Sequence, residues 1–133
     1  MTITPEMTLR IVIADDNSKM LAALLAVLSL EFEVVATANN GRCALEQIQR
    51  LQPVVAVLDL NMPELNGIEI TRKIRQNGLR SEVVICSVES DPELIAAAQR
   101  AGALGYVLKT RLNRDLVSAV KCVARGEAFV SNS

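Results

Sequence analysis

The sequence predicts an α/β fold in which a parallel β-sheet is covered by helices on both faces. Short runs rich in Val, Ile and Leu alternate with stretches whose apolar residues recur at helical spacing. Half of the 133 residues are hydrophobic, yet only two Phe and one Tyr are aromatic, so the core is aliphatic, as in a sheet buried on both sides. Alternation of this kind implies right-handed crossovers between parallel strands.

Five apolar runs are expected to form the strands, because each is short and most are rich in β-branched residues. They are residues 9–14, 33–38, 54–58, 83–86 and 105–108.

Helices are expected between and after these runs, and polar residues, Gly and Pro mark their ends. Asp16, Asn17 and Ser18 are alternative N-caps of the first helix. The others begin near residues 40, 68, 92 and 112, and the last ends at Gly126.

One domain over residues 9–126 is therefore predicted, with an N-terminal extension at 1–8 and a tail or linker start at 127–133. The net charge of −1 shows no nucleic-acid footprint, and no segment resembles a membrane span or a signal peptide. Three widely spaced cysteines form no CxxC motif, which favours reduced thiols in the cytoplasm. The absence of histidine excludes Ser–His and Cys–His catalysis.

Four of the five predicted strands end in a polar group that could serve a site. These groups are Asp15 with Asp16, Asp59, Ser87 and Lys109. In open α/β sheets, ligands bind beyond the carboxyl ends of the strands. Each residue alone has a simpler explanation, such as a helix N-cap for Asp16 or a solvated end for Lys109. Together they predict a site at this edge.

Three carboxylates at one edge repel one another and call for a cation. All-oxygen ligands suit Mg²⁺, with Mn²⁺ as the alternative ion. A metal, a hydroxyl and an ammonium together favour phosphoryl transfer, in which Asp59 would be the nucleophile and Ser87 and Lys109 would neutralise the phosphoryl oxygens. No P-loop or GxGxxG motif is present, which disfavours a nucleotide substrate.

These residues resemble the receiver domains of bacterial two-component response regulators from about Leu9 to Gly126. The matching motifs occur in family order, and they are Asp15-Asp16, Asp59-Leu60-Asn61-Met62-Pro63, Asn66-Gly67, Ser87 and Gly105-Tyr106-Val107-Leu108-Lys109. The resemblance implies a flavodoxin-like (βα)5 fold with a five-stranded sheet of order 2-1-3-4-5.

The resemblance also implies a role for each matching residue. Asp59 resembles the phosphoacceptor. A sensor histidine kinase or phosphotransfer protein would supply the phosphoryl group. Asp16 and Asp59 resemble direct Mg²⁺ ligands together with the backbone carbonyl of Asn61, and Asp15 would act through water. Ser87 and Lys109 resemble the residues that hold the phosphoryl oxygens.

Three further residues are expected to tune the switch. Tyr106 resembles the aromatic residue that moves inward as Ser87 moves toward the phosphate; the alternative is a half-buried strand residue with its hydroxyl in water. Asn61 and Glu89, each two positions after a site residue, are expected to set the lifetime of the acyl phosphate, and ordinary loop polarity is the alternative.

The region 102–109 and the Gly126-Glu127 ending are most similar to the subfamily whose receivers precede a helix-turn-helix DNA-binding domain. The resemblance implies control of transcription by that output domain, and a homodimer as a further assembly. DNA would bind only through the output domain. Thr110 follows Lys109 where many receivers have proline, so a trans peptide bond is expected.

Three other interpretations fit the same sequence. The chain could be a stand-alone receiver, or a pseudo-receiver that acts through protein contacts without phosphorylation. It could also be a metal-dependent phosphohydrolase with Asp59 as nucleophile, although such enzymes need a second acid/base carboxylate and a substrate-binding cap.

Overall fold

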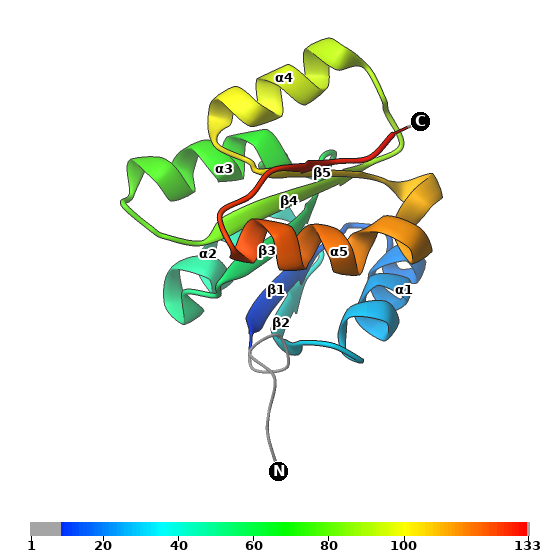
Figure 1. The fold of residues 1–133 in the computed structure, drawn as a ribbon. Helices are drawn as coiled ribbons and strands as arrows, with labels where there is room; N and C mark the ends of the chain where they lie inside the picture. The colour runs from blue at the N-terminus through cyan, green and yellow to red at the C-terminus, as the bar shows by residue number, and fades with distance from the viewer. Residues whose placement is uncertain (1–8, 133) are drawn as a thin grey trace.

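The computed structural model describes residues 9–132 and shows, within them, one parallel sheet of six strands in the order β2-β1-β3-β4-β5-β6 (Figure 1). The predicted N-terminal extension, residues 1–8, lies outside the described residues, as does Ser133. The predicted order 2-1-3-4-5 is confirmed. The strands are β1 (Arg10–Ala14), β2 (Glu33–Ala38), β3 (Val55–Asp59), β4 (Glu82–Ser87), β5 (Gly105–Leu108) and β6 (Phe129–Val130).

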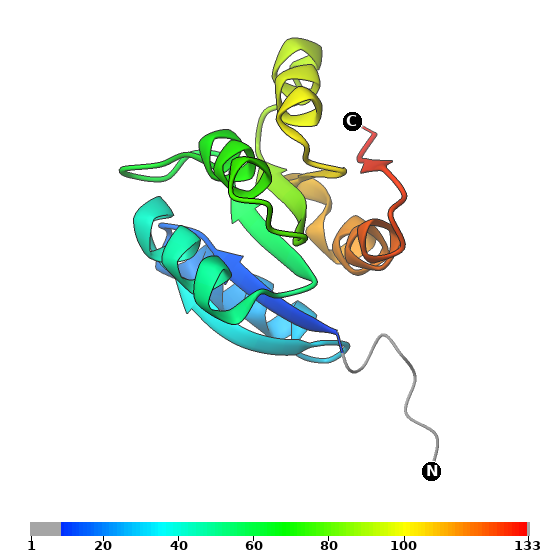
Figure 2. The same ribbon diagram turned by 90° about the vertical axis from the view of Figure 1, so that its left-hand side faces the viewer.

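Helices cover both faces of this sheet (Figures 1 and 2). They are α1 (Ser18–Leu28), α2 (Gly41–Leu51), α3 (Gly67–Gln76), α4 (Pro92–Ala101) and α5 (Leu112–Ala124), with a short 3-10 helix, η2 (Lys109–Arg111), before α5. Apolar residues of α2, α3 and α4 pack on one face, and those of α1 and α5 pack on the other. None of the helices in the described range is long and apolar enough to span a membrane.

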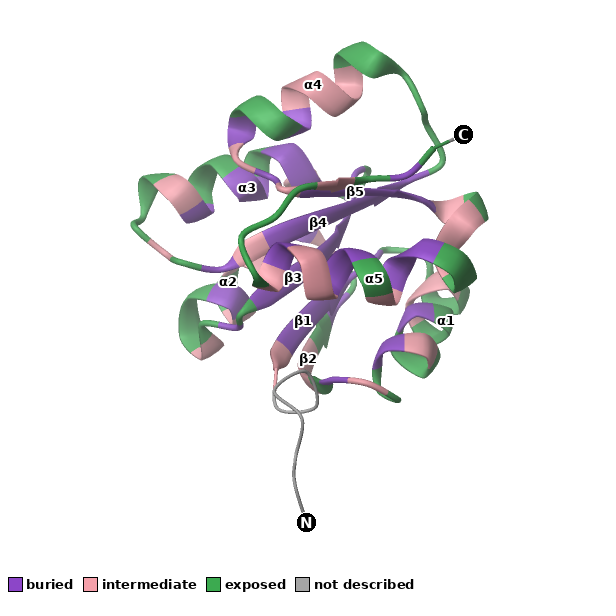
Figure 3. Ribbon diagram, in the orientation of Figure 1, coloured by how far each residue is buried: buried purple, intermediate pink, exposed green. Residues whose placement is uncertain are grey.

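The central strands are buried on both faces, which explains their unbroken apolar sequences. Every residue of β3 is buried, and so are the last four residues of β1 (Figure 3). At about 25 cal/mol for each Å² of apolar surface removed from water, such burial is the main stabilising contribution. The layer of fully buried strands therefore gives a rigid platform for the residues at its carboxyl edge.

Side-chain caps set where four of the helices, α1 to α4, begin, close to the predicted positions. Of the three alternative caps for α1, the structure selects Asn17, whose Oδ1 accepts the Met20 amide at 3.0 Å. Asn66 and Glu69 form a reciprocal capping box at the start of α3, with bonds of 2.8 and 2.9 Å. Such caps satisfy amide groups that have no partner inside the helix.

The tail predicted over residues 127–133 contains a sixth strand that was not predicted. Phe129 and Val130 pair with Gly105 and Tyr106 in parallel register. A strand of two residues is too short to produce a sequence pattern. It forms because β5 would otherwise leave a row of unpaired backbone groups along the edge of the sheet.

The cysteine thiols and the peptide bond after Lys109 are both as expected from the sequence: the thiols are unpaired and the bond is trans. All three cysteines are free: Cys86 is buried, Cys43 is exposed and Cys122 is half-buried. Burial raises the pKa of the Cys86 thiol to about 12, so it stays protonated and packs as a small apolar side chain. No peptide bond in the described range is cis, so the bond from Lys109 to Thr110 is trans as predicted.

Candidate functional site

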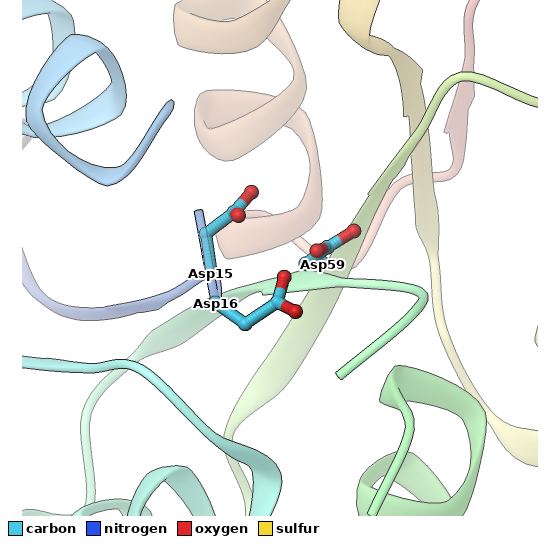
Figure 4. Close-up of side chains that lie close together, drawn as sticks. All are labelled: Asp15, Asp16 and Asp59. Atoms are coloured by element: carbon cyan, nitrogen blue, oxygen red, sulfur yellow. The ribbon is translucent and has the colours of Figure 1, made fainter. Parts of the chain in front are cut away.

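The predicted polar groups lie together at the carboxyl edge of the sheet. Asp15 and Asp16 follow β1, Asp59 and Ser87 end β3 and β4, and Lys109 follows β5. Because β1, β3, β4 and β5 are parallel neighbours, their ends lie side by side. Figure 4 shows the three carboxylates close to one another beyond β1 and β3.

The three aspartates form one compact cluster of oxygen ligands. One carboxylate oxygen from each of Asp15, Asp16 and Asp59 lies within 4.8 Å of the others. Asp15 is fully buried and Asp59 is only 5% exposed, whereas Asp16 is exposed. The cluster therefore has two inner carboxylates held by the core and one outer carboxylate in contact with solvent.

Lys109 joins the two inner carboxylates. Its Nζ lies 2.9 Å from Asp15 Oδ2 and 3.0 Å from Asp59 Oδ1. Although Asp15 Oδ2 is close to the ammonium, it is buried and has no well-aligned hydrogen bond among the described residues. Three carboxylates and one ammonium also leave two negative charges when all are ionised. Both facts, together with the all-oxygen donor set, fit a divalent cation such as Mg²⁺.

The pKa values of Asp59 and Lys109 reflect the burial of both groups and their mutual attraction. Burial raises the pKa of the Asp59 carboxyl and nearby Asp15 raises it further, while Lys109 opposes the rise. Burial alone would lower the pKa of Lys109, but its contacts with Asp15 and Asp59 outweigh that effect and raise it. Lys109 therefore stays charged at neutral pH and supplies a fixed positive charge beside Asp59.

Backbone amides orient the same carboxylates. The amide of Asn17 donates to Asp15 Oδ1 at 2.9 Å, and that of Asn61 donates to Asp59 Oδ1 at 3.4 Å. The side chain of Asn61 is exposed. The sequence pointed to Asn17 only as a cap, and nothing local to it marks the contact with Asp15. Asn17 therefore both begins α1 and fixes the inner aspartate.

Ser87, Glu89 and Tyr106 form a second group beside the carboxylates. The Ser87 hydroxyl is buried and accepts the Glu89 amide at 3.0 Å, while the Glu89 side chain is exposed. Tyr106 is 1% exposed, and its hydroxyl donates to the Glu89 carbonyl at 2.8 Å. The alternative of a half-buried tyrosine with its hydroxyl in water is thus wrong. The backbone of Glu89 links the two predicted switch residues.

The loop between β3 and α3, which carries Asn61, is seated on the start of α2. The amide of Gly41 donates to the Pro63 carbonyl at 3.1 Å. A Cβ added to Gly41 would lie 1.9 Å from the Leu65 carbonyl oxygen. Only glycine allows this close approach of two backbones. Gly41 was expected only to open a helix, and its contact with the loop was not apparent from the sequence.

We expect Gly41→Ala to destabilise the protein by about 1–3 kcal/mol, the usual range for overpacking. The methyl group must displace the loop backbone, because Leu65 presents a carbonyl there. Urea denaturation measures the change, and Cys43→Ala, at an exposed position of the same helix, is the matched control. Equal unfolding midpoints for the two variants would contradict the role given to Gly41.

The chain is similar to a known protein family and to several known proteins. Residues 11–121 match the family model "Response regulator receiver domain". The chain is 35% identical to the transcriptional regulatory protein DegU of Brevibacillus brevis, over 94% of this chain and 54% of that protein. It is 34% identical to the nitrate/nitrite response regulator protein NarL of Escherichia coli K12, over 92% of this chain and 58% of that protein. The chain thus spans little more than half of these relatives.

Solved structures show the same similarity in three dimensions. The signal receiver domain of NarL from Mycobacterium tuberculosis matches with a TM-score of 0.83 and 31% identity, over 91% of this chain and 99% of that chain. A two-component response regulator of the LuxR family from Aurantimonas sp. SI85-9A1 matches with a TM-score of 0.87 and 29% identity, over 92% and 89% of the two chains.

Proposed function

Since this chain belongs to the family of response regulator receiver domains, we propose that Asp59 accepts a phosphoryl group from a partner histidine kinase or phosphotransfer protein. The observation that carries the proposal is the position of Asp59. Its carboxylate lies at the sheet edge, 3.0 Å from a fixed ammonium and within the three-aspartate cluster. The product is an acyl phosphate that switches the domain between two conformations.

In the proposed reaction, Asp59 attacks the phosphorus atom of a phosphohistidine. A new O–P bond forms while the P–N bond breaks, and the imidazole nitrogen keeps the bonding electrons and takes up a proton. Both contacts of Asp59 described above involve Oδ1, so we assign the attack to Oδ2. Lys109 and the Ser87 hydroxyl then hold the oxygens of the transferred group, as positioning and charge neutralisation are the main needs of this reaction.

We propose that Asp16, Asp59 and the Asn61 carbonyl hold the Mg²⁺ ion directly, with Asp15 acting through water. Bound there, Mg²⁺ would neutralise charge on the phosphoryl oxygens. Supporting this assignment, the carboxylate oxygens lie within 4.8 Å of one another and the Asn61 amide already contacts Asp59. Mn²⁺, which takes similar oxygen ligands, is the alternative ion.

Labelling from a small phosphodonor such as acetyl phosphate tests the function directly. We expect one alkali-labile, hydroxylamine-sensitive phosphoryl group per chain with Mg²⁺, and none with a chelator. Sustained turnover of a phosphomonoester would instead indicate the phosphohydrolase. A pseudo-receiver should show no Mg²⁺ binding that Asp16→Asn weakens.

We expect Asn61→Ala and Glu89→Ala to change the lifetime of the acyl phosphate by several-fold. Both side chains are exposed, and both residues contact site groups through their backbones. Their side chains can therefore reach the attacking water without holding the site together. Phosphate release from the pre-labelled protein measures the lifetime, and Gln76→Ala, an exposed change at the end of α3, is the control. Unchanged lifetimes in both variants would leave the two side chains as ordinary loop polarity.

For the whole protein, we propose control of transcription through a DNA-binding output domain beyond this chain. The relative DegU is named a transcriptional regulatory protein and NarL a response regulator protein, and this chain covers only 54% and 58% of their lengths. We further propose a cytoplasmic location, which the three free thiols support, and a homodimer as the assembly that phosphorylation favours. A stand-alone receiver would be labelled in the same way, but phosphorylation would not change DNA binding by the full-length protein.

A further inference from the structure

The segment that follows α5 lies along the outer edge of β5, and Figure 1 shows it as the red trace beside that strand. The Phe129 amide donates to the Leu104 carbonyl at 3.0 Å, and the Ser131 amide donates to the Tyr106 carbonyl at 2.9 Å. These bonds supply partners for one side of an edge strand. The segment is thus attached to the same strand that carries Tyr106 and leads into Lys109.

Beyond these backbone bonds, two buried polar side chains fasten the segment. The Ser131 hydroxyl donates to Asp115 Oδ2 at 2.7 Å and accepts the Leu108 amide at 3.1 Å. Ser131 and Asp115 are each 7% exposed, and Arg114 Nε lies 3.6 Å from the other oxygen of Asp115. We call the Ser131–Asp115 pair the latch. A buried polar atom is costly to leave without a hydrogen bond, so losing the Ser131 hydroxyl from Asp115 Oδ2 would destabilise the closed latch.

We propose that Ser131 and Asp115 are positioning residues for the phosphorylation site, acting through the end of β5. Leu108, whose amide the latch holds, directly precedes Lys109. Lys109 must stay within about 3 Å of two carboxylates, 2.9 and 3.0 Å here, and displacements of about 1 Å are costly in such a site. The role of Lys109 rests on the function proposed above.

The same latch reaches the switch residues on the other side of β5. Ser131 holds the Tyr106 carbonyl, and the Tyr106 hydroxyl holds the Glu89 carbonyl. Glu89 in turn donates its amide to Ser87. A continuous series of hydrogen bonds thus joins Asp115 on α5 to the hydroxyl expected to hold the phosphoryl group.

The first test needs no ligand and compares Ser131→Ala with Ser118→Ala, an exposed serine on the same α5 helix. Loss of one hydrogen bond should speed exchange of the Leu108 amide by up to about tenfold. The chain has one tyrosine and no tryptophan, so intrinsic fluorescence reports on Tyr106 alone and should change in Ser131→Ala. Unchanged exchange, or unchanged emission of Tyr106, would overturn the proposal.

A second test measures whether the latch acts on the site. We expect Ser131→Ala to bind the phosphoryl mimic beryllofluoride, with Mg²⁺, about 3–10-fold more weakly than the unaltered protein. Asp115→Asn, which keeps a carbonyl acceptor for the Ser131 hydroxyl, should lose less affinity for beryllofluoride than Ser131→Ala. Ile48→Val, a buried change on α2 remote from β5, controls for lost stability. Equal affinity in Ser131→Ala and the unaltered protein would show that the latch only fastens the C-terminal segment and does not position the site.

The two tests separate this inference from the proposed function. If the unaltered protein bound no beryllofluoride, the proposed function would fail, and the assigned effect on Lys109 would fail with it. If it bound normally but Ser131→Ala bound equally well, only the positioning role would be overturned. The exchange and fluorescence measurements need no beryllofluoride, so they test the latch whichever of these results is found.

Discussion

Asp59→Asn is expected to abolish labelling from a phosphodonor while leaving the protein folded. Asparagine has nearly the same shape, but its amide is not a nucleophile and cannot form the acyl phosphate. Incorporation of label, measured with Mg²⁺ present, should fall to background. Glu93→Gln, an exposed change on α4, is the control for loss of a carboxylate and should label normally.

The same substitution should also stabilise the fold at neutral pH. Burial raises the pKa of Asp59 above that of the unfolded chain, so the folded state holds its proton more tightly. The ionised carboxylate therefore costs stability above the raised pKa, and that cost disappears as the pH falls through it. Asp59→Asn should show a higher melting temperature at pH 7 and a smaller difference in acid. Magnesium-dependent labelling that survives in Asp59→Asn would move the acceptor to another aspartate.

Lys109→Met is expected to slow phosphoryl transfer by about 10²–10³-fold, the usual cost of losing one group that stabilises developing charge. The ammonium lies 3.0 Å from Asp59, where the phosphoryl oxygens would lie beside it. The rate of label incorporation measures the effect. Lys121→Met, a change on α5 whose ammonium lies 3.7 Å from Glu31, is the matched control and should label at the unaltered rate.

Binding of Mg²⁺ should change in the opposite direction. Lys109 is a positive charge that competes with a cation for Asp15 and Asp59, so its removal should tighten Mg²⁺ binding while transfer slows. The variant should also be less stable at neutral pH, because two buried carboxylates lose their partner, and should recover as the pH falls. Weaker Mg²⁺ binding in Lys109→Met would show that the lysine organises the metal site instead of competing with it.

Those expectations rest on residues that the sequence already marked, because strand ends are readable from local patterns. An apolar run of five residues ending in Asp59 identifies both a buried strand and the end that faces ligands. The order of the first five strands followed from the resemblance, and the structure confirms it. The N-caps could be predicted for the same local reason, although Asn17 had two rivals.

Other features depended on contacts between distant residues and could not be read locally. The loop packs on Gly41 through the backbone of Leu65, and the Tyr106 hydroxyl is held by the Glu89 carbonyl. The strand at Phe129–Val130 was predicted as tail, since its pairing partner is β5 and its own pattern is too short. A serine near the chain end carries no sign that it meets a buried aspartate.

Alternation and strand length are local properties, so the sequence is enough to predict five βα units with Asp59 among polar strand ends. The ion pairs of Lys109 with Asp15 and Asp59, and the hydrogen bond from Ser131 to Asp115, are seen only in the folded chain. Both are pairings of polar groups that burial makes costly to leave unmade. Burial is a property of the packed chain, and that is why these contacts first became visible in the fold.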